Sequence, residues 1–268
     1  MEKIPCTVGI LTFNSGKTLE RALESVKDFA DILVCDGGST DETLAIASHY
    51  GARVIRQNPA FQNSGGALTD YAGVRNQCLD SAQFDWFFYI DSDEEATTEL
   101  VENIRATVAE SAPAHLVYNI SPRILLKGRR IEYSSNYPGW QKRFFNRKTG
   151  ARFRKAVHER IDYDEQAYPV GTLRGHWLYE IGLKEDAAKT EKYARMDATL
   201  YRMNSWGAFT VFAVRKAGTI CKIAVRFLLN RILHGSRALP FVVEWRRIRY
   251  QVKLTQYIFS DLVSNTLV

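Results

Sequence analysis

Residues 86–93 read WFFYIDSD, five aromatic or aliphatic residues followed by two aspartates one residue apart. An unbroken run of this kind is typical of a strand buried on both faces of a parallel sheet. Ligands of open parallel sheets bind beyond the carboxyl ends of the strands, where Asp91 and Asp93 would stand. Two carboxylates at that place suit a hard divalent cation that also binds substrate phosphates. A solvated acidic loop before the next helix is the competing interpretation.

Two further acids, Glu94 and Glu95, follow the aspartates directly. A cluster of four acids is costly unless a cation or another partner neutralises it, because each charge disfavours ionisation of its neighbours. Nothing in the adjacent sequence supplies a counter-charge. The sequence therefore predicts that a metal ion neutralises this cluster.

The first 120 residues alternate apolar runs with stretches of helical periodicity. Further strands are predicted at residues 6–13, 31–35 and 52–56, and helices at about 19–26, 39–50, 70–81 and 97–112. Ser39-Thr40-Asp41-Glu42 has the pattern of a capping box, which predicts the start of the second helix. Strands alternating with helices predict an α/β fold, with a mostly parallel central sheet and helices on both faces.

The pattern changes after Pro113 to short strands, predicted at 116–120, 123–126 and 130–133, with a hairpin turn at Lys127-Gly128-Arg129. Helical segments follow at 185–204 and 217–233. We expect one α/β domain over residues 1–204, divided into halves at 1–122 and 123–204. Residues 205–268 are expected to form a basic amphipathic helical appendage.

The composition is that of a globular protein, since 46% of the 268 residues are hydrophobic and 25% are charged. Fibrous and wholly disordered classes are thereby excluded. The net charge of +6 is unevenly spread: residues 1–122 hold 8 basic and 18 acidic side chains, whereas residues 123–160 hold 12 and 2. Basic blocks favour anionic partners, but the acidic strand-rich half argues against nucleic acid.

Four scattered cysteines fit buried thiols in a reducing compartment rather than a disulfide scaffold or a metal site. The first residues, MEKIPCTVGILTF, indicate a strand rather than a secretory signal. No uncharged apolar run reaches the roughly 18 residues of a spanning helix. These features predict a cytoplasmic protein.

A second motif, Cys35-Asp36-Gly37-Gly38-Ser39-Thr40-Asp41, ends the predicted second strand. Its glycines permit a ligand to approach the backbone closely, and the following helix offers amides to an anion. Helix capping is the better interpretation for Ser39 and Asp41. It explains Asp36 less well.

The sequence resembles the family 2 glycosyltransferases of the GT-A fold. The similarity lies in four segments: Thr12-Phe13-Asn14, the segment VCDGGSTD at 34–41, AGVRN at 72–76 and DSD at 91–93. Val157-His158-Glu159, then His176, Lys189 and Tyr193, are similar to a subgroup that includes lipopolysaccharide-core β-glucosyltransferases. The resemblance covers about residues 5–200.

The resemblance implies an inverting transferase that moves a sugar from a UDP-sugar, such as a UDP-hexose, to a hydroxyl of a glycan or lipid-linked glycan. Residues 1–122 would bind the nucleotide sugar, and residues 123–204 would face the acceptor. Asp36 corresponds to the acid on the uracil and ribose, Arg75 to a residue that contacts the diphosphate or orders the metal loop, and Asp93 to the direct ligand of Mg²⁺ or Mn²⁺. The implied donor-binding residues are Thr12, Asn14, Asp36, Gly38, Arg75, Asp91, Ser92, Arg143 and His158, and the implied metal ligands are Asp91, Asp93 and His176.

Inverting transfer needs one general base, and the resemblance together with the chemistry points to Glu159. With Asp93 it forms the expected catalytic pair. Two departures from the family pattern stand out: the Glu-Asp pair that usually holds the base is absent in this region, and Ser15-Gly16-Lys17 replaces an acid that often follows Asn14. A structural role is the alternative for each histidine, and a solvated strand position is the alternative for Arg143.

Residues 205–253 combine ten basic side chains and a single acid, Glu244, with interleaved aromatics and leucines. This pattern fits a helix that lies peripherally on an anionic membrane, on the inner face of the plasma membrane. A helical hairpin packed on the catalytic domain is the alternative. For the whole chain, a nucleotidyltransferase of related fold and a non-catalytic glycan- or nucleic-acid-binding module remain alternatives.

Overall fold

The computed structural model describes residues 2–63, 68–156, 159–182, 187–201, 203 and 205–266. The chain divides into two compact units. The first comprises Met1–Arg123 and Pro138–Glu180, and the second Ile124–Tyr137 and Ile181–Val268. The expected division into a catalytic domain over residues 1–204 and an appendage over residues 205–268 stays a prediction.

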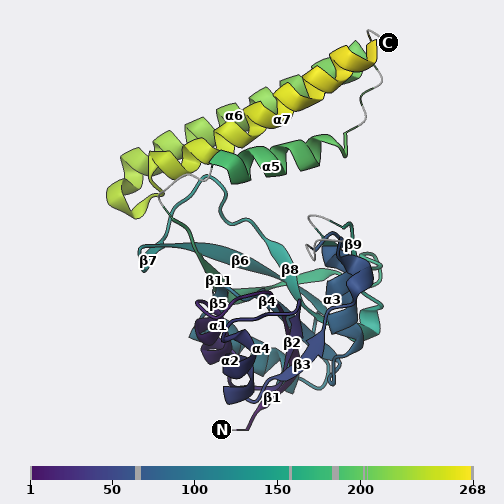
Figure 1. Ribbon diagram of the computed structural model, residues 1–268. Coiled ribbons are helices and arrows are strands. Elements are labelled where there is room, and N and C mark those ends of the chain that lie inside the picture. The colour runs from purple at the N-terminus through teal and green to yellow at the C-terminus, as the bar shows by residue number, and fades with distance from the viewer. Residues whose placement is uncertain are drawn as a thin grey trace. The chain divides into compact units, whose positions relative to one another are not determined.

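Within the described residues the strands form one nine-stranded sheet and a separate two-stranded one (Figure 1). The strands are β1 (Ile4–Thr12), β2 (Phe29–Asp36), β3 (Arg53–Arg56), β4 (Trp86–Asp91), β5 (Glu94–Ala96), β6 (Val117–Leu126), β7 (Arg129–Ile131), β8 (Gln141–Asn146), β9 (Arg152–Arg154), β10 (Arg160–Asp162) and β11 (Val170–Glu180). The large sheet has the order β3-β2-β1-β4-β8-β6-β11-β5, with β7 beside β6, and the small one pairs β9 with β10. β3, β2, β1 and β4 run parallel, whereas β8 is antiparallel to both β4 and β6.

Three helices of the first unit connect the parallel strands, and the fourth joins β5 to β6 (Figure 1). They are α1 (Leu19–Ser25), α2 (Thr43–His49), α3 (Tyr71–Asp80) and α4 (Thr98–Ala109), with the short 3-10 helices η1 (Pro59–Phe61) and η2 (Arg147–Thr149). The Asp70 side chain caps α3 by accepting from the Gly73 amide at 2.9 Å, and Thr97 caps α4 in the same way. The α/β GT-A architecture expected from the sequence is confirmed, but the sheet is mixed rather than mostly parallel, because β5, β7 and β8 pair antiparallel with their neighbours.

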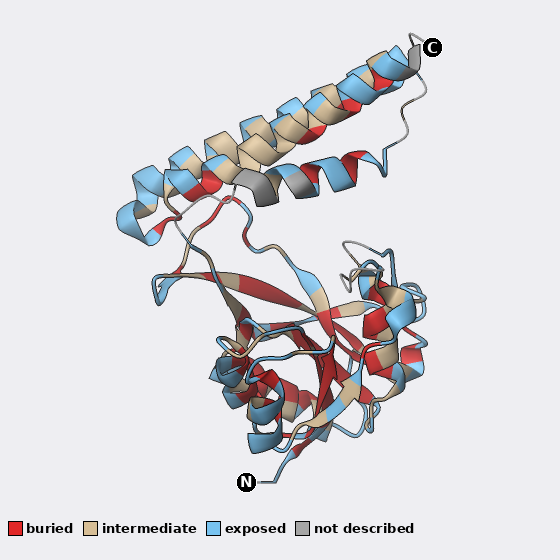
Figure 2. Ribbon diagram, in the orientation of Figure 1, coloured by how far each residue is buried: buried red, intermediate tan, exposed pale blue. Residues whose placement is uncertain are grey.

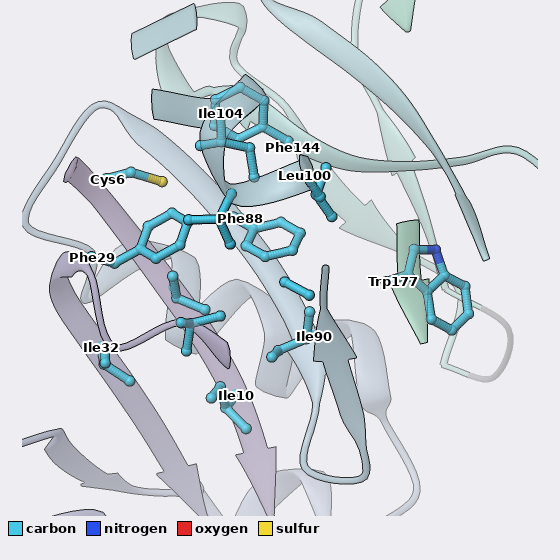
Figure 3. Close-up of a cluster of buried hydrophobic side chains, with 14 of the residues drawn as sticks. Cys6, Ile10, Phe29, Ile32, Phe88, Ile90, Leu100, Ile104, Phe144 and Trp177 are labelled. Atoms are coloured by element: carbon cyan, nitrogen blue, oxygen red, sulfur yellow. The ribbon is translucent and has the colours of Figure 1, made fainter. Parts of the chain in front are cut away.

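The core of the first unit lies where the central strands meet the helices. Phe88 and Ile90 of β4 are fully buried among side chains from β1, β2, α4 and β8 (Figure 3). Both faces of β1 and β4 are covered, which explains why their sequences are continuous apolar runs rather than alternating ones. The predicted burial of cysteines is confirmed for Cys6, Cys35 and Cys78 but not for Cys221, which is exposed.

Two sequence predictions of local structure were wrong. α2 begins at Thr43, four residues after Ser39, so the capping box does not form. The Ser39 hydroxyl instead donates to Asp36, and Asp41 accepts from the Thr43 amide at 3.1 Å. The two strands expected between residues 116 and 126 are one continuous strand, β6. The hairpin after it turns at Lys127 and Gly128, which both have positive φ, as tight hairpin turns require.

The second unit is mostly helical. Its helices are α5 (Ala187–Ala198), α6 (Trp206–His234) and α7 (Phe241–Thr266), and η3 (Gly235–Arg237) joins the last two. α7 packs against both α5 and α6, and Leu254, Ile258 and Ala194 lie in the small core between them. Most of the surface of α6 is exposed or half-buried (Figure 2). Among the described residues, we find no helix with the length and apolar character needed to span a bilayer.

Candidate active site

Three loops meet at the carboxyl ends of β1, β2 and β4. Asn14 has φ +49°. Its side-chain oxygen accepts a hydrogen bond from the Thr40 backbone amide at 2.9 Å, and its backbone amide donates to the Ser39 hydroxyl at 2.8 Å. The hydroxyls of Ser15 and Ser92 lie 2.9 Å apart, which joins the first loop to the Asp-Ser-Asp loop. The structure thus brings the two predicted motifs together at one sheet edge, the usual ligand position of such folds.

Asp36 orders the loop after β2. One carboxylate oxygen accepts from the Gly38 and Ser39 amides, both at 2.8 Å, and the other accepts from the hydroxyls of Thr12 and Ser39. Burial acts to raise the pKa of Asp36, but these hydrogen bonds outweigh it and hold the pKa below its ordinary value. Gly38 has φ +97°, a conformation that other residues rarely adopt. Both Asp36 and Gly38 therefore have a structural reason to be where they are, beside any role in binding.

Arg75 of α3 joins two predicted site acids. Its guanidinium donates to Asp91 Oδ1 and, at 3.0 Å, to Glu159 Oε1, and it stacks over the Tyr89 ring at 4.6 Å. Only 4% of Arg75 is exposed. Burial acts to raise the pKa of Asp91, but the charges of Arg75 and Arg143 outweigh it, and the pKa lies below its usual value. Asp91 and Glu159, 68 positions apart in the sequence, are thus held by one side chain.

Arg143 lies in a buried ion pair with Glu94, and its expected role in donor binding stays a prediction. Its guanidinium binds both carboxylate oxygens of Glu94 and donates to Gln141 at 3.0 Å, and it stacks on the Trp177 ring at 3.8 Å. Only about 6% of either charged side chain is exposed, so the alternative of a solvated strand position for Arg143 was wrong. Glu94 in turn accepts from the Asp91 amide at 2.8 Å, so the pair supports the backbone of the Asp-Ser-Asp loop.

The argument that the acidic cluster lacks counter-charges was wrong. Asp91 and Glu94 are paired with the two buried arginines, and Glu95 lies 3.4 Å from Arg21. Burial raises the pKa of Glu94 to about 7, although its arginine partner acts in the opposite direction. Because these partners come from residues 21, 75 and 143, the local sequence could not reveal them. The charge of the cluster is therefore no reason to expect a metal. The support for a metal is the chemistry of its ligands.

The donor set fits a hard cation that shares a diphosphate. Asp91 keeps 43% of its side chain exposed, Asp93 is exposed, and Mg²⁺ is usually bound by one or two carboxylates plus substrate phosphates. In the described part of the chain, however, no group of three His, Cys, Asp or Glu side chains is arranged to hold a metal. His176 lies on β11, where its backbone bonds Thr97 and its Nδ1 lies 3.2 Å from the Ser121 carbonyl. That His176 is a third metal ligand stays a prediction.

Glu159 stands immediately before β10, with 17% of its side chain exposed. The two acids that follow it have local partners: Asp162 pairs with Arg154 at 3.3 Å, and Asp164 accepts from backbone amides after it. His158 lies outside the described residues. Of the acids in this segment, Glu159 is the one that contacts the Arg75 network.

Sequence reasoning missed three residues of this network. Glu94 was taken only as added negative charge, and Tyr89 and Trp177 were not considered. Tyr89 had a usable signal, because residues two apart on a strand face the same side and Tyr89 stands two before Asp91. Trp177 had none, since β11 is far away in the sequence.

Residues 7–163 match the model of the family described as Glycosyl transferase family 2. This match spans more than half of the chain and includes every residue from Thr12 to Glu159 discussed above. The chain belongs to glycosyltransferase family 2.

The chain is also similar to curated proteins and to a solved structure, each over part of its length. An uncharacterized glycosyltransferase of Rickettsia felis is 32% identical over 152 residues, which are 55% of this chain and 49% of that protein. A TPR repeat-containing protein of Synechococcus elongatus is 30% identical over 150 residues, 56% of this chain and 33% of the other. This family 2 chain thus spans half or less of the curated relatives it matches. A crystal structure of S. aureus TarS 1–349 in complex with UDP has a TM-score of 0.48 at 16% identity, and the similarity covers 96% of this chain and 81% of that one.

Proposed function

We propose that this family 2 protein is a metal-dependent inverting glycosyltransferase, which moves a hexose from a UDP-hexose to a hydroxyl of a glycan or a lipid-linked glycan. The observation that carries the proposal is the Arg75 bridge. It holds Glu159, the expected base, and Asp91, part of the expected diphosphate site, on one buried guanidinium. A transferase needs these two groups at a fixed separation, because the acceptor oxygen must attack from the face opposite the leaving diphosphate.

Glu159 supplies the base in this proposal. Arg75 occupies Oε1, so Oε2 is the oxygen that takes the proton of the acceptor hydroxyl. As that proton leaves, the acceptor oxygen forms a bond to the anomeric carbon, and the bond from that carbon to the UDP oxygen breaks. The 3.0 Å hydrogen bond from Arg75 fixes the orientation of Glu159 for this proton transfer.

On the donor side, Asp91 and Asp93 are the residues that would hold Mg²⁺ or Mn²⁺, which when bound would neutralise the negative charge that develops on the departing diphosphate. The loops after β1 and β2, with Thr12, Asn14, Asp36, Gly38 and Ser92, would receive the nucleoside. In this assignment Arg143 is a positioning residue. It acts through Glu94 on the backbone of the metal loop rather than on a phosphate.

The last part of the proposal concerns the acceptor and the membrane. Basic side chains near Glu159, at Arg154, Lys155 and Arg160, are compatible with an anionic glycan. The similarity of Val157-His158-Glu159 and His176 to lipopolysaccharide-core enzymes favours a glycan of the cell envelope. We place the enzyme on the inner face of the plasma membrane, with an anionic lipid surface as a partner, because of the basic aromatic-rich residues 205–253.

Release of UDP from UDP-hexose, by water where no acceptor is supplied, tests the activity. We expect release to depend on Mg²⁺ or Mn²⁺, to stop in EDTA, and to be lost in Asp93→Ala with the fold retained. Asp80→Ala, an exposed acid of α3 paired with Arg152, is the matched control and should keep full activity. Unchanged release in EDTA or in Asp93→Ala would exclude the proposed role. Metal-independent nucleotide binding without release would favour a binding module.

A further inference from the structure

The end of the α6–α7 hairpin, residues 225–249, exposes an unusual number of large apolar side chains. We call this segment the hairpin tip. Five of these side chains lie on α6, with 51–78% of their surfaces exposed, and three lie on α7, with 41–56% exposed. They are Val225, Leu228, Leu229, Ile232, Leu233, Phe241, Val242 and Trp245. Monomeric proteins rarely leave so many apolar side chains together in water without a binding role.

The apolar residues of α6 follow helical spacing. Val225, Leu228, Leu229, Ile232 and Leu233 stand at positions i, i+3, i+4, i+7 and i+8, which places them on one face. Such a face normally packs on a core, but here it is open to solvent (Figure 2). On the opposite side of α6 the Phe227 ring packs against α7, where its centroid lies 5.6 Å from that of Phe241, and Phe241 lies 5.8 Å from Trp245.

The charge of the hairpin tip is almost entirely positive. Six arginines stand in it, at positions 226, 231, 237, 246, 247 and 249, and the one acid is Glu244. Glu244 is buried, with 1% exposed, and its oxygens accept from Ser134, Ser135 and Arg247. Two of the arginines, Arg226 and Arg231, donate to backbone carbonyls, which leaves their charge unneutralised by those contacts.

We propose that the hairpin tip is the surface by which this protein docks on a membrane containing anionic lipid. Leucine, isoleucine and the aromatic rings would enter the boundary between headgroups and acyl chains, while the arginines would bind lipid phosphates. A second copy of the chain fits less well, because two such surfaces face to face would bring like charges together. The inference rests on the proposed membrane partner and specifies which residues make the contact.

Tryptophan fluorescence can locate the contact, because three exposed tryptophans stand at different places. Trp245 lies in the hairpin tip, Trp206 begins α6 beside Phe259, about 20 Å of helix from Trp245, and Trp140 belongs to the first unit. The full-length protein is mixed with vesicles of phosphatidylcholine and phosphatidylglycerol whose acyl chains carry bromine, a quencher of tryptophan emission. We expect quenching at low salt that Trp245→Phe removes and that Trp206→Phe and Trp140→Phe leave in place.

Vesicle affinity of further variants and its dependence on salt complete the test. Leu228→Ser with Ile232→Ser should lower vesicle affinity at least about tenfold, whereas Val54→Ser, an exposed apolar residue of β3, should not. Raising salt from 0.1 M to 1 M should also weaken binding, since the screening length falls from about 10 Å to about 3 Å. Binding should be unchanged in Asp93→Ala, so a failure of the proposed transfer reaction would leave this result intact.

Three outcomes would overturn the proposal. Absence of vesicle binding at low salt would reject a lipid surface altogether. Quenching that Trp206→Phe removes would mean that another part of α6 makes the contact. Self-association in lipid-free solution that Leu228→Ser with Ile232→Ser abolishes would assign the face to a second copy.

Discussion

Arginine has opposite roles at the sheet edge and at the hairpin tip. Arg75 and Arg143 are 4% and 5% exposed, and carboxylates from distant parts of the chain surround them. The hairpin tip concentrates six arginines around one buried acid. Buried, paired charge fixes geometry, because breaking a pair leaves an uncompensated ion. Arg231 and Arg237 of the hairpin tip are instead exposed, so that an outside partner can reach their charge.

Removing the base should give the largest effect. Glu159→Gln keeps the size of the side chain and an oxygen for Arg75 but cannot accept a proton, so UDP release should fall by roughly 10²–10⁴. UDP affinity, measured on the same protein, should hardly change. Asp162→Asn, which alters only an exposed ion pair, serves as the control. Near-normal release in Glu159→Gln would place the base elsewhere.

Breaking the buried ion pair between Arg143 and Glu94 should give the second-largest effect. Arg143→Met leaves Glu94 buried without its partner and should lower the free energy of unfolding by about 3–5 kcal/mol. Adding Glu94→Leu removes the stranded charge and should recover much of that loss. Urea denaturation of the two variants measures both effects, with Arg154→Met at an exposed pair as the control, expected within about 1 kcal/mol. If Arg143→Met alone were as stable as Arg154→Met, the pair of Arg143 and Glu94 would not be what holds the Asp-Ser-Asp loop.

Asp36 should give a smaller, pH-dependent effect. Asp36→Asn weakens the charge-assisted hydrogen bonds and should cost about 2 kcal/mol of stability at pH 7. Because the pKa of Asp36 is lower in the folded protein than in the unfolded chain, its stabilisation is present above the unfolded value of about 3.9 and is lost as pH falls through the lower folded value. Urea midpoints of both proteins should therefore converge in acid. A difference that stays constant down to acid unfolding would contradict this account.

Much of the sheet edge was predictable. The apolar run before Asp91 and the glycine motif after β2 located both loops, because strand ends in a parallel sheet follow directly from strand patterns. The partners of Asp91 and Glu94 were not predictable, since Arg75 and Arg143 meet them only through tertiary packing. α7 was predicted only in part: residues 205–268 were expected to be helical, with a hairpin as the alternative, but no range was predicted for a second long helix.

The smallest effect should come from the hairpin tip. Arg231→Gln removes an exposed charge that donates to the Gly235 carbonyl, and the free energy of unfolding should change by no more than about 0.5 kcal/mol. Its affinity for anionic vesicles should nevertheless fall. Thermal unfolding and vesicle sedimentation on the same sample separate the two quantities. A large loss of stability in Arg231→Gln would contradict the proposed difference between the buried, paired arginines and this exposed one.

The most direct test of the proposed transferase site is calorimetry of UDP binding with and without Mg²⁺ or Mn²⁺. Asp91 and Asp93 offer carboxylates to a cation, and UDP brings a diphosphate that the acids would otherwise repel. We predict tight binding only when the metal is present, and equally weak binding in EDTA and in Asp93→Ala with metal. Binding of equal strength with and without metal, or undiminished binding in Asp93→Ala, would contradict the assignment of this sheet edge as a metal-dependent UDP-sugar site.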